Sequence, residues 1–230
     1  MTIAKFAALL AALLACFVLP DSAALAAGGG SMDMPRVPAQ SRTPEDDARM
    51  AYNAGVKQIE KATGLEQDAA RATDDGKRER ALKKAQGAYE KAAREFEKAV
   101  SKMPDLHEGW NYLGFSRRHL GRYDSALEAY DRALKLKPGY ADALEYRAEA
   151  YLGLNRLDDA RKSYMDLYVS SRKHADQLLE SMQKYIEARR KEPNGLAAQQ
   201  LDEFARWVDE RAGIAQQTAS LDTGSQASWH

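Results

Sequence analysis

The sequence predicts an all-α fold, an α-solenoid of about three helical hairpins followed by C-terminal capping helices. Helix-forming Ala, Leu, Glu, Lys and Arg dominate, and the runs of Val, Ile and Thr typical of strands are absent. Small, aromatic, small and Pro residues also recur at an interval of 34 residues, a length typical of stacked hairpins. The two clearest copies are Tyr89, Ala92, Phe96, Ala99, Pro104 and Tyr123, Ala126, Tyr130, Ala133, Pro138; a weaker third is Leu157, Ala160, Tyr164, Leu167.

Residues 1–26 are predicted to be a signal peptide. Lys5 precedes an apolar run from Phe6 to Leu19, Pro20 ends that run, and Ala24–Ala26 supplies a small-x-small cleavage pattern. The run is shorter than the roughly 20 apolar residues that a membrane-spanning helix needs. We therefore expect export to the periplasm or outside the cell, with cleavage after Ala26.

Cys16 supports an alternative, a membrane-anchored lipoprotein. Leu13–Cys16 loosely resembles a lipobox, but Leu14 fits poorly before the small residue and Phe17–Leu19 prolong the apolar run. The intact mass of the mature N-terminus distinguishes Ala27 from an acylated Cys16. Since Cys16 is the only cysteine, cleavage after Ala26 leaves a chain without a thiol or a disulfide.

Residues 27–44 are predicted to be a flexible leader, because Gly, Ser and Pro are frequent and no periodicity is present. The first helix is expected from Glu45 to about Ala62, with Pro44 beside its start and acidic residues in its first turn. A polar connector is expected from Gly64 to about Lys77.

A long basic helix follows, from about Arg78 to Lys102, and Pro104 ends it. Its apolar residues are spaced by three and four, and its other face is rich in Lys and Arg. That face is either solvated and partly neutralised by neighbouring glutamates or a basic docking strip. The basic residues are Lys77, Arg78, Arg80, Lys83, Lys84, Lys91, Arg94 and Lys98.

Two regular hairpins come next, followed by two further amphipathic helices. The Pro193–Gly195 turn separates the latter two, and the last is expected to end near Ala212. This organisation predicts a repeat domain over 45–174, C-terminal helices over 175–214 and a disordered, Ser-, Thr- and Gln-rich tail over 215–230. The helices of the regular hairpins are expected at Leu106–Leu120, Tyr123–Leu136, Tyr140–Gly153 and Leu157–Ser170.

The second hairpin resembles a tetratricopeptide repeat. Gly114 and Ala126 are small where the two helices would cross, aromatic residues would fill the space between hairpins, and Pro138 would end the second helix. The match is strong over 107–140 and good over 141–174, whereas the first copy is atypical, with Gly55 as its small crossing residue. The matching residues are Trp110, Leu113, Gly114, Gly121, Tyr123, Ala126, Tyr130, Ala133 and Pro138.

The resemblance implies a protein-binding groove on the concave side, lined by the first helix of each hairpin. Family members that clamp a C-terminal carboxylate use Lys and Asn at set places, and this chain lacks that set. A partner segment with an apolar anchor near Tyr52 and Phe115 and a basic residue near Glu145 and Glu149 suits the sequence better. The residues implied to line the groove are Arg49, Tyr52, Val56, Glu108, Asn111, Phe115, Arg118, Asp142, Glu145 and Glu149.

Composition and motifs argue against other functions. The formal net charge is zero, from 34 basic and 34 acidic residues, whereas non-specific nucleic-acid binders need a basic excess. The four histidines lack metal-type spacing, so surface or capping roles are expected for them, and no phosphate-binding loop is present. We expect no enzyme, no cofactor, no nucleic acid and no membrane insertion after signal cleavage. The histidines are His107, His119, His174 and His230.

Two functions remain. The first is an exported adaptor whose groove binds an extended or helical segment of another envelope protein. The alternative is a structural or assembly scaffold that self-associates through the basic helix or the C-terminal helices. Either function could also belong to a membrane-anchored lipoprotein. Tyr52 and Phe115 exposed in a groove would favour the adaptor. An exposed face of Phe204, Trp207 and Val208 would favour self-association.

Overall fold

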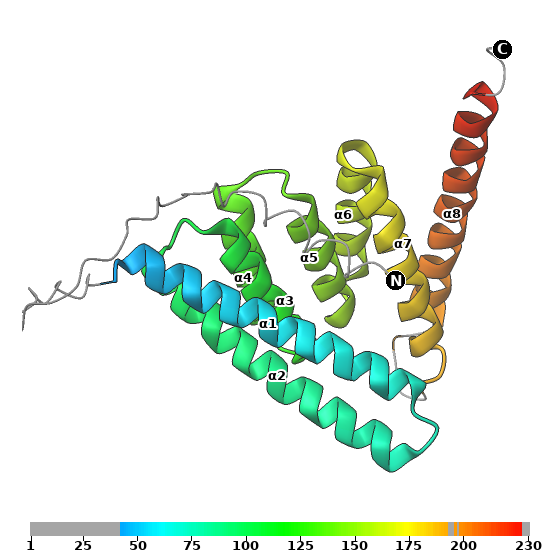
Figure 1. Ribbon diagram of the computed structural model, residues 1–230. Coiled ribbons are helices and arrows are strands. Elements are labelled where there is room, and N and C mark those ends of the chain that lie inside the picture. Colours follow the sequence, from blue (N-terminus) through cyan, green and yellow to red (C-terminus); the bar gives the residue numbers. More distant parts are fainter. Residues whose placement is uncertain (1–41, 193–195, 197, 227–230) are drawn as a thin grey trace, which may run out of the picture. The chain divides into compact units, whose positions relative to one another are not determined.

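The computed structural model describes residues 42–192, 196 and 198–226 of the chain. The predicted signal peptide 1–26, its cleavage site, Cys16 and nearly all of the leader 27–44 lie outside these residues, as do residues 227–230. Every regular element in the described part is an α-helix, which confirms the all-α prediction (Figure 1). The helices are α1 (Pro44–Arg71), α2 (Asp75–Lys102), α3 (His107–His119), α4 (Tyr123–Leu136), α5 (Ala141–Gly153), α6 (Leu157–Ser170), α7 (Arg172–Arg189) and α8 (Ala198–Gln226).

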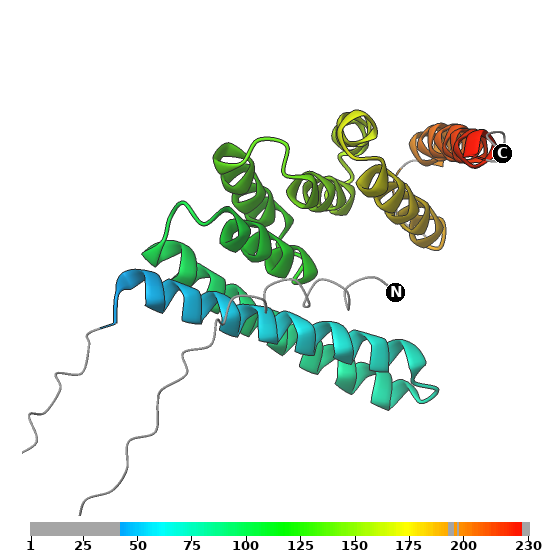
Figure 2. The same cartoon turned by 45° about the horizontal axis from the view of Figure 1, so that its top comes forward.

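The helices pair in chain order into hairpins that stack side by side. Helices α1 and α2, α3 and α4, and α5 and α6 pack as antiparallel pairs, and each pair contacts the next (Figures 1 and 2). Further contacts join α1 to α3, α3 to α5 and α5 to α7. The odd-numbered helices thus form one continuous layer, and its surface is called the odd-helix face below.

Small residues let an aromatic ring pack between the helices of a hairpin. A Cβ atom on Gly114 would lie 2.6 Å from the ring of Tyr130, and one on Gly55 would lie 2.7 Å from the ring of Phe96. Tyr130 and Phe96 are fully buried, and half-buried Trp110 packs on both neighbouring cores. The predicted crossing residues Gly114 and Gly55 are therefore confirmed.

The predicted polar connector from Gly64 to Lys77 is wrong. Helix α1 continues through Gly64 to Arg71, and only a short link separates it from α2. The residues after Gly64 are mostly good helix formers, Ala69 is buried, and Glu66 accepts a hydrogen bond from the Tyr89 hydroxyl of α2 at 2.9 Å. Asp74 then caps α2 by accepting a hydrogen bond from the backbone N–H of Lys77 at 2.7 Å.

The C-terminal helices belong to the same core as the last repeat. Leu178 of α7 and Phe204 of α8 share one buried cluster with Tyr164 of α6, as expected for capping helices. The predicted tail 215–230 is wrong over most of its length, because α8 continues to Gln226. Once a helix has formed, each added residue gains a backbone hydrogen bond at little further cost, so polar residues can extend it.

None of the helices in the described part of the chain has both the length and the apolar character that a membrane span requires.

Candidate protein-binding face

The predicted groove residues lie on three contacting helices of the odd-helix face. The α1 members start at exposed Arg49 and continue to half-buried Tyr52 and Val56. Helix α3 carries Glu108, Asn111, Phe115 and Arg118, and α5 carries Asp142, Glu145 and Glu149.

Phe115 and Asn111 are core residues. Phe115 is 6% exposed and its ring packs against Tyr89 of α2, His119 of α3 and Tyr146 of α5. Asn111 is 1% exposed. The prediction that Phe115 offers an exposed apolar anchor is therefore wrong, since the long first hairpin and α5 close over this position.

Arg118 and Glu149 join successive helices of the odd-helix face. The Arg118 guanidinium and the Glu149 carboxylate form an ion pair at 2.9 Å, and Ser181 of α7 donates a hydrogen bond to Glu149 at 2.6 Å. Burial opposes the charge of Arg118, but the Glu149 carboxylate together with Tyr130 and Tyr146 outweighs it, so the pKa of Arg118 is raised. The two charges compensate each other, and separating them would leave an uncompensated buried charge. Neither charge is therefore free to bind a partner protein.

Glu145 and Asp142 lie one turn apart on α5. Glu145 is only 7% exposed, and burial, followed by the nearby Glu149 and Asp142 carboxylates, raises its pKa to about 8. Glu145 is therefore mostly protonated at neutral pH in the free protein. Asp142 is more exposed and lies 3.1 Å from Nε2 of His174 on α7.

Tyrosines surround these acids, and the predicted groove omitted most of them. Tyr112 of α3 stacks on Phe96 with ring centroids 5.4 Å apart. Tyr52 of α1 packs edge-on against Tyr112, with ring centroids 5.9 Å apart. Burial raises the pKa of Tyr112, and the nearby carboxylates raise it further. Those carboxylates belong to Asp142, Glu108 and Glu60, on α5, α3 and α1.

One surface of the odd-helix face thus combines acids and tyrosines. We call Glu108, Tyr112, Asp142, Glu145 and Tyr146 the acidic tyrosine surface. The repeat interval could have found its two tyrosines, because Tyr112 and Tyr146 are 34 residues apart, as are Glu108 and Asp142. A cationic side chain would meet carboxylates and tyrosines here together, although Arg118 already lies over the Tyr146 ring at 5.6 Å.

His119 is not simply a surface or capping residue. Its Nδ1 lies 3.3 Å from the Glu66 carboxylate of α1, and its ring stacks on Tyr89 of α2 at 4.4 Å. Burial lowers the pKa of His119, and Arg118 acts in the same direction. Within the described residues no group of His, Cys, Asp and Glu is arranged to hold a metal ion.

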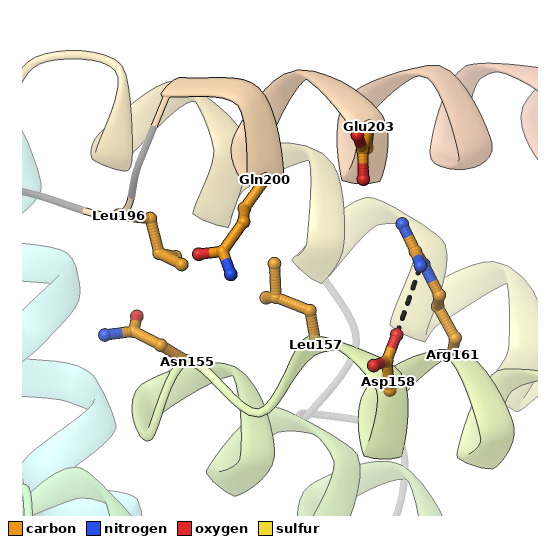
Figure 3. A pocket seen from close by; sticks show the side chains of 7 residues that line it. All are labelled: Asn155, Leu157, Asp158, Arg161, Leu196, Gln200 and Glu203. Carbon is orange, nitrogen blue, oxygen red and sulfur yellow. Dashed lines mark hydrogen bonds and ion pairs between the residues drawn. The ribbon is translucent and has the colours of Figure 1, made fainter.

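A small polar pocket lies between α6 and α8 (Figure 3). Its volume is about 180 Å³, which is below the 300–1,000 Å³ typical of ligand pockets. Arg161 in its wall pairs with Asp158 at 3.1 Å and stacks over Phe204 and Trp207, so its charge is already used. The pocket is a weaker site than the odd-helix face. Its lining is Asn155, Leu157, Asp158, Arg161, Leu196, Gln200 and Glu203.

Stacked antiparallel hairpins, with an aromatic ring packed against a glycine in the first two of them, define an α-helical repeat protein. The family model described as tetratricopeptide repeat matches residues 80–141 and 116–177, from within α2 to within α7. The chain is a tetratricopeptide repeat protein. Such repeats generally mediate protein–protein interactions, and the family typically consists of modules without catalytic activity. A comparison with curated proteins found no match.

Proposed function

We propose that this protein is an adaptor whose acidic tyrosine surface binds a basic segment of a partner protein. The observation that carries the proposal is the gathering of Glu108, Asp142 and Glu145 around aromatic rings on contacting helices. The nearest buried cation, Arg118, is already paired with Glu149. Glu108 and Asp142 each lie 3.1 Å from a histidine, His107 and His174, and the pKa of Glu145 stays raised despite Arg118 and Lys173. A Lys or Arg side chain of a partner would add positive charge beside these acids.

Protonated Glu145 makes the proposed binding depend on pH. Its pKa near 8 reflects burial beside other carboxylates, and a bound Lys or Arg side chain would lower that pKa again. Binding would then release a proton from Glu145. The affinity for a basic segment is accordingly expected to rise as the pH is raised from about 6 to about 8.

We further propose that the partner is an envelope protein. The support is the predicted signal peptide over residues 1–26, and the mass of the mature N-terminus tests it, as it tests the lipoprotein alternative. Self-association through the C-terminal helices has less support. Phe204 and Val208 are fully buried inside the α6–α8 core rather than exposed.

Charge reversal tests the proposed surface. We expect Glu108→Lys with Asp142→Lys to weaken capture of envelope proteins at least about tenfold, since like charges would then face each other. The control is Glu128→Lys with Asp166→Lys, which makes the same charge change at exposed positions of α4 and α6. Capture from envelope extract, followed by the affinity of peptides from the captured proteins, is the measurement. Equal loss in both variants, or captured segments that are acidic, would contradict the proposal.

A further inference from the structure

A groove runs between α1 and α2. The residues that line it are different from the aromatic residues of α1 and α2 whose rings pack on α3. The volume of the groove is about 500 Å³. Buried Ala88 and half-buried Leu65 form an apolar floor. Apart from the neighbouring residues and backbone of α2 itself, no atom lies within 4 Å of the position that a Cβ on Gly87 would take, so the floor is open there. We call this surface the lysine groove; its lining is Gln58, Lys61, Leu65, Lys84, Gly87, Ala88 and Lys91.

Three lysines line the lysine groove, and none of them belongs to an ion pair among the described residues. The sequence explains this for Lys61 and Lys84, because the positions three and four residues away on either side hold no acid. Lys91 has one candidate, Glu95, but Glu95 pairs with Lys98 at 2.7 Å.

Two further carboxylates of α1 and α2 have partners outside the groove lining. Glu66 of α1 accepts a hydrogen bond from the Tyr89 hydroxyl at 2.9 Å. Glu90 of α2 pairs with Arg122, the N-cap residue of α4, at 2.5 Å. The lysine groove therefore carries positive charge that these carboxylates do not neutralise.

We propose that the lysine groove binds an acidic amphipathic α-helix of a partner protein. The apolar stripe of that helix would lie on Ala88, Leu65 and the open space at Gly87. Lys84 and Lys91 are two helical turns apart on α2, so carboxylates spaced by seven residues on the bound helix would reach both. Lys61 on α1 would meet the opposite flank of the bound helix.

This surface is independent of the acidic tyrosine surface. The two carry opposite charge, so they select segments of opposite sign and can be occupied together. A helix also suits the lysine groove better than a lipid surface does. The apolar floor is recessed between two helices, and the zero net charge of the chain gives no long-range attraction to an anionic membrane.

The test uses a fluorescein-labelled synthetic helix of about 18 residues, with Leu and Ala on one face and Glu along both flanks. We expect the full chain to bind it, as measured by fluorescence anisotropy, and added salt to weaken the binding. Lys61→Glu with Lys84→Glu and Lys91→Glu should weaken binding at least about tenfold. The matched control makes the same charge change at exposed lysines on other helices: Lys135→Glu, Lys162→Glu and Lys184→Glu.

A second variant separates the groove from charge alone. Gly87→Leu fills the open floor, keeps every lysine and raises the helix propensity of an exposed position. It should weaken binding to a similar degree while leaving the circular dichroism spectrum unchanged. The proposal is overturned if the acidic helix does not bind, if the control variant loses as much affinity, or if Gly87→Leu binds as well as the natural chain. Binding to phosphatidylglycerol vesicles without binding to the peptide would also overturn it.

Discussion

Tyr130→Ala is expected to lower the free energy of unfolding by about 3–5 kcal/mol, as truncation of a large buried aromatic side chain does. Tyr130 is fully buried between α3 and α4, and its ring fills the space left by Gly114 and faces Tyr146 of the next hairpin. Its loss leaves a cavity where two repeats meet. Urea unfolding monitored by circular dichroism measures the change.

Gly114→Ala provides the matched control for Tyr130→Ala. In the natural chain the added methyl group meets the Tyr130 ring at 2.6 Å, so we expect destabilisation. In the Tyr130→Ala background the methyl group has room, and alanine favours a helix over glycine by about 1 kcal/mol. Gly114→Ala should therefore stabilise that background. Additive effects of the two substitutions would show that the ring and the small residue do not pack together.

Glu145→Gln is expected to change how stability depends on pH. Burial raises the pKa of Glu145 from an ordinary value of 4.5 to about 8, so between these values the folded state holds a proton that the unfolded state has lost. The contribution of Glu145 to stability is full below about pH 4.5 and is lost as the pH rises to about 8. Over this window the natural chain should lose up to several kcal/mol relative to Glu145→Gln, at no more than about 1.4 kcal/mol per pH unit.

Urea unfolding of both proteins at several pH values between about 5 and 8.5 measures this difference. Shared groups that do not interact with Glu145 cancel in the comparison, whereas Glu149 and Asp142 are coupled to it. Glu128→Gln makes the same substitution at an exposed position of α4 and is the matched control. Parallel curves for the natural chain and Glu145→Gln would show that the Glu145 proton is not held more tightly in the folded state.

The repeat packing could be predicted from the sequence because it depends on local spacing. Phe96 and Tyr130 are separated by the repeat interval, and each large ring needs a small residue on the facing helix. Gly55 and Gly114 are those small residues. The same interval relates Tyr112 to Tyr146, so the tyrosines of the acidic tyrosine surface were visible as well. The predicted groove does not contain them, because the family pattern implies other positions on the same helices.

The accessibility of the groove residues could not be predicted, because it depends on the atypical first hairpin. The helical continuation past Gly64 brings Glu66 to His119, beside which Phe115 is buried. The pairing of Arg118 with Glu149 could not be predicted either, because it depends on the relative orientation of α3 and α5. The raised pKa of a buried acid likewise follows from packing rather than from residue type.

Site-specific photocrosslinking tests the central claim most directly. A benzoylphenylalanine at Tyr112, within the acidic tyrosine surface, is compared with one at exposed Glu128 of α4 after illumination of living cells. The account predicts that position 112 forms adducts with a protein segment rich in Lys and Arg, that Glu108→Lys with Asp142→Lys removes them, and that position 128 forms none. Adducts that form equally at both positions, or that join position 112 to an acidic segment, would contradict it.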